Sequence, residues 1–91
     1  MNNSITVEGI REAFFEIEKV AYTQSNQGRR TRELLLSFHD RRSVDIFGFV
    51  NLDRKLQRHA MYLIESHIHS PHCIAHLFKD NLKELSRFDE L

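Results

Sequence analysis

The sequence predicts a mainly α-helical protein, a small bundle of three to four helices forming a single domain over residues 1–91. The 91 residues include only three glycines and one proline, and scarce helix breakers favour helices over many short strands. Several stretches repeat apolar residues every three or four positions, the period of one helix face. A composition of 41% hydrophobic and 29% charged residues is typical of a folded domain with its own core.

The first helix is expected over Val7–Gln24, with Ser4 or Thr6 as its N-cap. Its apolar residues recur at 3-4-3-4 spacing and form one stripe: Val7, Ile10, Phe14, Ile17 and Ala21. Residues 25–28 are predicted to form the turn after this helix. Gly28 suits a left-handed helix cap there, because glycine has no Cβ to clash.

The next segment admits two interpretations. Good helix formers predict a helix over Thr31–His39. Residues 44–50 are rich in β-branched and aromatic side chains, so a β-hairpin near 34–50 is the alternative, which would make the fold α+β. We favour the helix because Ser43 can cap it and the apolar periodicity continues without a break. The prediction is therefore one long helix over Val44–Ile68.

The periodic residues of that long helix lie close to one line: Phe49, Leu52, Leu56, Ala60, Leu63 and His67. Ser70 and Pro71 then provide a start signal, serine at the N-cap and proline at the first helical position. The last helix is expected over Pro71–Arg87. Its apolar face contains Ile74, Leu77, Phe78, Leu82 and Leu85.

Side chains able to bind a transition metal are concentrated in ten residues: His67, His69, His72, Cys73 and His76. Zinc prefers four nitrogen or sulfur ligands in a tetrahedron, and His72 and His76 are spaced i,i+4. Both, however, lie opposite the apolar face of their helix, beside Lys79 and Lys83. We therefore expect surface histidines, with His67 near the core, and no cofactor. A zinc-stabilised module, with His67, His69, His72 and His76 as ligands, is the third hypothesis for the function.

The positive charge is concentrated in the middle of the chain. The formal net charge is zero, yet residues 29–58 carry eight basic and four acidic groups. Arginine forks suit phosphate, and a nucleic-acid-binding transcriptional regulator is the second hypothesis. Its contacts would be Arg29, Arg30, Arg32, Arg54, Lys55 and Arg58. The neutral total argues against strong sequence-independent binding to nucleic acid.

Nothing in the sequence assembles a catalytic site, so we expect a protein that is not an enzyme. There is no glycine-rich phosphate loop or nucleophile elbow. His72 and Cys73 are neighbours whose side chains would project about 100° apart on a helix, which is unsuitable for a nucleophile–base pair. A single cysteine, no secretory signal and no membrane-length apolar run predict a cytoplasmic protein without a membrane partner.

Several apolar side chains fall outside the core stripes: Phe15, Tyr22, Phe47 and Met61. Phe15 and Tyr22 are seven residues apart and so share one side of the first helix. Exposed aromatic residues frequently mark binding surfaces. The first hypothesis is therefore a non-enzymatic regulatory or adaptor protein that binds another protein, or itself as a homodimer. The expected contacts are Phe15, Tyr22 and Phe47.

Overall fold

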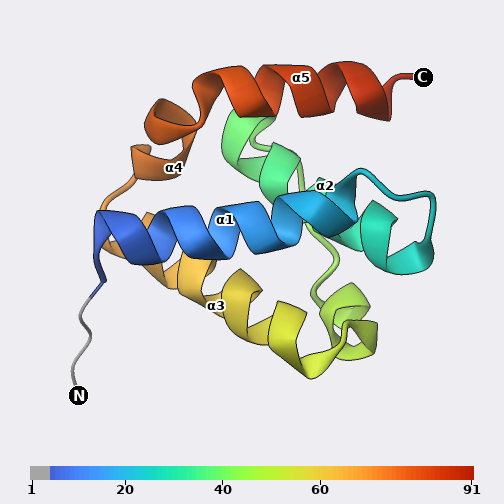
Figure 1. Ribbon diagram of the computed structural model, residues 1–91, viewed down its shortest axis with the longest axis horizontal. Helices are drawn as coiled ribbons and strands as arrows, with labels where there is room; N and C mark the ends of the chain where they lie inside the picture. The colour runs from blue at the N-terminus through green and yellow to red at the C-terminus, as the bar shows by residue number, and fades with distance from the viewer. Residues whose placement is uncertain (1–4) are drawn as a thin grey trace.

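The computed structural model describes residues 5–91, and this range contains helices and no strand (Figure 1). The elements are α1 (Val7–Ala21), α2 (Asn26–Asp40), the 3₁₀ helix η1 (Ile46–Asn51), α3 (Arg54–His69), α4 (Cys73–Leu77) and α5 (Lys79–Asp89). The prediction of a mainly α-helical bundle is confirmed. The alternative hairpin near 34–50 is wrong, since that segment forms the end of α2, a loop and η1.

The first helix begins where the sequence predicts. The Thr6 side chain accepts a hydrogen bond of 2.9 Å from the Gly9 amide, the usual role of an N-cap. Ser4, the other candidate, lies outside the described residues. The helix ends at Ala21, earlier than the predicted Gln24. After this end the Thr23 hydroxyl donates to the Val20 carbonyl over 2.7 Å, which satisfies one of the last carbonyls of the helix.

The second helix begins five residues earlier than predicted. Ser25 is its N-cap and accepts 2.9 Å from the Gly28 amide. Gly28 therefore lies in the first turn of α2, and none of the glycines has a positive φ, so the predicted left-handed cap is wrong. A Cβ on Gly28 would lie 2.3 Å from the Thr23 carbonyl oxygen. The glycine is needed here for the close approach of the α1–α2 connection.

The long helix predicted over Val44–Ile68 is divided into η1 and α3. Leu52 is extended, with φ −76° and ψ 150°, and its side chain is only 4% exposed. Asp53 then caps α3 by accepting 3.0 Å from the Leu56 amide, and its own amide donates 2.9 Å to Gln27 Oε1 at the start of α2. The N-cap carboxylate and the burial of Leu52 thus end one helix and begin the next.

The last predicted helix is also divided in two. Ser70 ends α3 instead of capping a new helix, and α4 begins at Cys73 after His72, whose φ is 76°. Phe78 separates α4 from α5 with φ −118°. Its ring is 1% exposed and stacks on Phe14 with centroids 3.8 Å apart and planes 6° from parallel. This stacking accompanies a bend between α4 and α5, although the apolar periodicity of the sequence continues through it.

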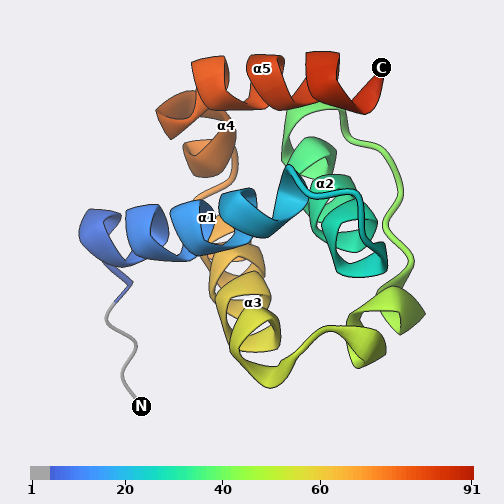
Figure 2. The same cartoon turned by 45° about the vertical axis from the view of Figure 1, so that its right-hand side comes forward.

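The core lies where α1 packs against α2 and α3, and α2 against α5. In both views α1 lies between α5 and α3 (Figures 1 and 2). Apolar side chains from α1 to α5 and from Leu52 form one buried cluster. Thr31 of α2 is fully buried, and its hydroxyl donates to the carbonyls of Gln27 and Gly28 over 2.8 and 3.0 Å. A helix covered on most sides tolerates this polar group because its own backbone satisfies it.

None of the helices within residues 5–91 has the length and apolar character needed to cross a membrane.

Candidate functional site

The structure separates the histidines that the sequence places close together. The His67 ring packs against Phe38, with centroids 5.3 Å apart. His69 Nε2 lies 3.9 Å from Glu65 on the outside of α3, and His72 forms the turn before α4. Within residues 5–91 there is no group of three or more His, Cys, Asp or Glu side chains that could bind a metal ion. The predicted zinc ligands therefore do not converge into a site in this part of the chain.

Cys73 lies in a hollow of about 570 Å³ between the start of α1, the end of α3 and α4. Its thiol donates to the Ser66 carbonyl, with 3.8 Å between Sγ and oxygen. Burial raises the pKa of this thiol above its ordinary value, so the sulfur stays protonated and is a poor nucleophile at neutral pH. His69 and His76 also line the hollow. This environment is that of a structural thiol.

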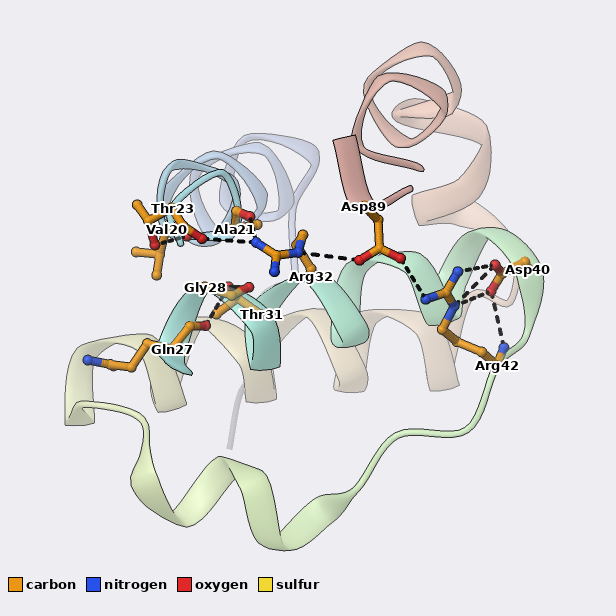
Figure 3. A network of polar contacts seen from close by, with 10 residues as sticks. All are labelled: Val20, Ala21, Thr23, Gln27, Gly28, Thr31, Arg32, Asp40, Arg42 and Asp89. Atoms are coloured by element: carbon orange, nitrogen blue, oxygen red, sulfur yellow. Dashed lines mark hydrogen bonds and ion pairs between the residues drawn. The ribbon is translucent and has the colours of Figure 1, made fainter. Parts of the chain in front are cut away.

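Arg32, one of the predicted phosphate contacts, instead connects three helices (Figure 3). Its Nη1 donates to the carbonyls of Ala21 and Thr23 over 2.9 Å each. Its Nε lies 3.4 Å from Asp89 Oδ1, an ion-pair contact without hydrogen-bond geometry, and its guanidinium carbon lies 5.2 Å from the centre of the Phe88 ring. The side chain is only 12% exposed, so little of it could reach a phosphate.

Arg30 also has a structural role. Its Nη1 lies 3.6 Å from both Glu33 and Asp45. Its side chain covers Gly48 so closely that a Cβ there would lie 2.7 Å from Arg30 Cδ. This contact holds η1 against α2. The predicted nucleic-acid set therefore loses two of its arginines to structural roles.

The remaining basic candidates are exposed: Arg29, Arg54, Lys55 and Arg58. Among residues 5–91, none of the ion pairs involves these four side chains. Arg54 and Arg58 line one shallow hollow on the outer face of α3, together with Met61, Tyr62 and Glu65. Their charge is thus available to a partner, next to an apolar side chain.

Phe15 and Tyr22 are partly used within the domain. They are 42% and 38% exposed, so they lie outside the core stripe as predicted. Phe15 meets Phe78 edge to face at 5.7 Å, and Tyr22 meets Phe88 at 5.1 Å. Between them the Asn81 amide donates to Glu18 over 3.2 Å. These contacts join α1 to α5, which leaves less of either ring for a partner.

Phe47 differs, because it lies in an exposed apolar group. Phe47 and Val50 are 77% and 71% exposed, and residues three apart share one side of a 3₁₀ helix. Val50 and Met61, itself 60% exposed, line the same hollow of about 260 Å³, whose floor includes Ala60. The apolar group therefore extends from η1 onto α3. Together with the adjacent Arg54 and Arg58 it is called the η1–α3 surface below.

Reasoning from the sequence found Phe47, Met61, Arg54 and Arg58 but missed Val50. In the expected continuous helix, Val50 and Met61 would be eleven residues and about 16 Å apart along the axis, whereas the break between η1 and α3 brings both to one hollow. Asp45, which accepts 3.0 Å from the Phe47 amide, was the available signal for a short capped helix.

No family model, curated protein or solved structure matches the chain.

Proposed function

We propose that this chain is a non-enzymatic regulatory or adaptor protein that binds another polypeptide through the η1–α3 surface. The main observation is a group of exposed apolar side chains: Val50 and Met61, 71% and 60% exposed, line one hollow, and Phe47, 77% exposed, lies three residues before Val50 on the same side of η1. Burying a side chain of this size contributes roughly 1.5–3 kcal/mol. Such a group is costly to leave in water and is typical of an interaction surface.

The charges beside this group support a polypeptide partner. Arg54 and Arg58 are exposed along the edge of Met61, an arrangement of apolar centre and polar rim that is common in protein interfaces. Arginine and aromatic residues also contribute strongly to binding hot spots. A phosphate backbone needs no apolar centre. For this reason we rank nucleic-acid binding through Arg29, Arg54, Lys55 and Arg58 second.

The test is a photo-crosslinking amino acid placed at Phe47 and expressed in cells of the source organism. We expect covalent adducts with protein from position 47. The matched control places the same group at Lys83 of α5, which is exposed and lies on the α5 side of the molecule, away from η1 (Figure 1). It should give no specific adduct.

A second variant separates specific binding from chance collision. Val50→Asp should reduce the adduct yield from position 47 by about tenfold, since a charge replaces a central apolar contact. Circular dichroism should stay unchanged because Val50 is exposed. Absence of a protein adduct at position 47 contradicts the proposal. Adducts with nucleic acid alone would favour the arginine-based hypothesis in its place.

A further inference from the structure

We infer that the polypeptide bound by the η1–α3 surface is a second copy of this chain, docked antiparallel along α3 with the two Met61 side chains facing each other. This inference rests on the proposed function and names its partner. It follows from the order of charges along the exposed face of α3, from the position of its apolar edge and from the net charge of the chain.

The exposed face of α3 changes in charge along its length. At 100° per residue one strip contains Arg54, Arg58, Met61, Glu65 and Ile68, and all five are exposed. Arg58, Met61 and Glu65 line one shallow hollow, which shows that they are adjacent in space. The N-terminal half of this strip is basic, and the C-terminal half carries the carboxylate.

An antiparallel two-fold arrangement matches these charges. A residue before Met61 on one copy then faces a residue about as far after Met61 on the other. Arg58 is three positions before Met61 and Glu65 is four after, so each Arg58 faces the Glu65 of the other copy. The symmetry produces two such pairs. A parallel two-fold arrangement would instead bring the two Arg58 side chains together.

The apolar side chains match under the same symmetry. Gln57, Met61, Ile64 and Ile68 follow the edge of α3 that faces η1, where Gln57 Nε2 donates 2.9 Å to the Phe49 carbonyl. A two-fold axis perpendicular to α3 brings this edge against itself in reverse order. Val50, beside the N-terminal half, then meets the C-terminal half of the other copy. That half exposes Ile68, which is 69% accessible in the single chain.

The net charge and the size of the surface determine the expected affinity. The formal net charge is zero at pH 7, so no long-range repulsion opposes association of two copies. The exposed side chains named on α3 and η1 are fewer than the roughly 20–30 residues per partner of a standard interface. We therefore expect a weak dimer, with a dissociation constant of about 10 µM or higher.

Sedimentation of the full chain tests the dimer over roughly 5–500 µM, the range that a weak interface requires. The wild type should approach twice the mass of one chain. Arg58→Glu should raise the dissociation constant at least about tenfold, because it opposes two carboxylates across the interface. Glu65→Arg should do the same by opposing two guanidiniums. Both residues are exposed, so circular dichroism should be unchanged.

The two variants together provide the decisive measurement. A mixed dimer of Arg58→Glu with Glu65→Arg again pairs opposite charges at both positions. An equimolar mixture should therefore recover the mass that each variant alone has lost. If neither variant changes the mass of a wild-type dimer, or if the mixture does not recover, the antiparallel arrangement is overturned.

Disulfide crosslinking tests the position of the symmetry axis. Met61→Cys in a Cys73→Ser background should form an intermolecular disulfide under mild oxidation, because residues beside a two-fold axis approach within bridging distance. Arg54→Cys in the same background should not. Position 54 is seven residues from the axis, so its two copies would lie about 21 Å apart at 1.5 Å per residue. Equal crosslinking from both positions contradicts the arrangement.

A single-chain mass for the wild type at about 500 µM, beyond the range of a weak dimer, overturns the inference. The proposed function then stands or falls separately with the crosslinking experiment. An adduct from position 47 with a different protein would keep that function and reject the dimer. An adduct with a second copy supports both.

Discussion

At the scale of single residues, the same type of side chain has different roles according to its surroundings. Arg29 and Arg32 are both in α2, three residues apart. Arg29 is exposed, whereas Arg32 caps the carbonyl end of α1 and contacts α5. A charged hydrogen bond to a half-buried carbonyl is worth more than a surface ion pair. Two arginines of the same helix therefore contribute differently to the free energy of unfolding.

Replacing Arg32 by alanine should destabilise the protein by about 2 kcal/mol, since two charge-assisted hydrogen bonds and a ring contact are lost. Arg29→Ala is the matched control and should change the free energy of unfolding by less than about 0.5 kcal/mol. Urea denaturation of the two variants measures both values. Equal and small effects would show that Arg32 is not a structural residue.

Acid should weaken the ion pair between Asp40 and Arg42 at the end of α2. A hydrogen bond of 2.7 Å from Arg42 lowers the pKa of the Asp40 carboxyl from its ordinary 3.8. The folded state thus binds this proton less readily than the unfolded state. The stability from Asp40 is present above its ordinary pKa and is lost as the pH falls through the lowered value.

Asp40→Asn should remove this pH dependence. The variant is expected to be less stable than the wild type at neutral pH, by under about 1 kcal/mol because the pair is largely exposed. The difference should shrink as the pH falls through the lowered pKa of Asp40, because the protonated carboxyl is neutral like the asparagine amide. Denaturation at several pH values checks this, and two parallel stability curves would contradict it.

At the scale of elements, the ends of helices are determined by local contacts more than by apolar periodicity. Asp53 divides the segment predicted as one helix by accepting from the Leu56 amide, and Ser25 begins α2 earlier than expected. Capping side chains satisfy amide groups that would otherwise be unpaired. A continuous stripe therefore does not guarantee a continuous helix.

Gly28→Ala gives an element-scale prediction in which two effects oppose each other. Helix propensity alone favours alanine by up to about 1 kcal/mol. However, the new Cβ would lie 2.3 Å from the Thr23 carbonyl oxygen, and backbone cannot move as a flexible side chain does. We expect net destabilisation of about 1–3 kcal/mol, as for other forced steric contacts. Thermal melting measures it, and a higher melting temperature would show that the connection relaxes easily.

At the scale of the whole molecule, α1 is joined to both α3 and α5. Tyr62 of α3 accepts 3.1 Å from the Thr6 amide, and Tyr22 packs on Phe88 of α5. The Phe14–Phe78 stack connects the two sides through the core. A single buried cluster that includes all these helices favours unfolding in one cooperative step.

Tyrosine fluorescence can test this cooperativity, because the chain has two tyrosines and no tryptophan. Tyr22→Phe leaves a reporter between α1 and α3, and Tyr62→Phe leaves one between α1 and α5. In each variant, the transition followed by fluorescence in denaturant should coincide with that followed by circular dichroism. An earlier loss of the Tyr22 signal would mean that α5 detaches first.

The sequence by itself determined the helical class and most of the core, because one-sided burial imposes the 3.6-residue period directly on the chain. Only the tertiary structure decided three other matters. Phe78 stacks on Phe14, more than sixty residues away in the sequence, which divides the last helix. Arg32 is drawn to carbonyls and a carboxylate that belong to other helices. Val50 and Met61 come to line one hollow only through the packing of η1 against α3. Each of these depends on contacts between distant segments, which local periodicity does not encode.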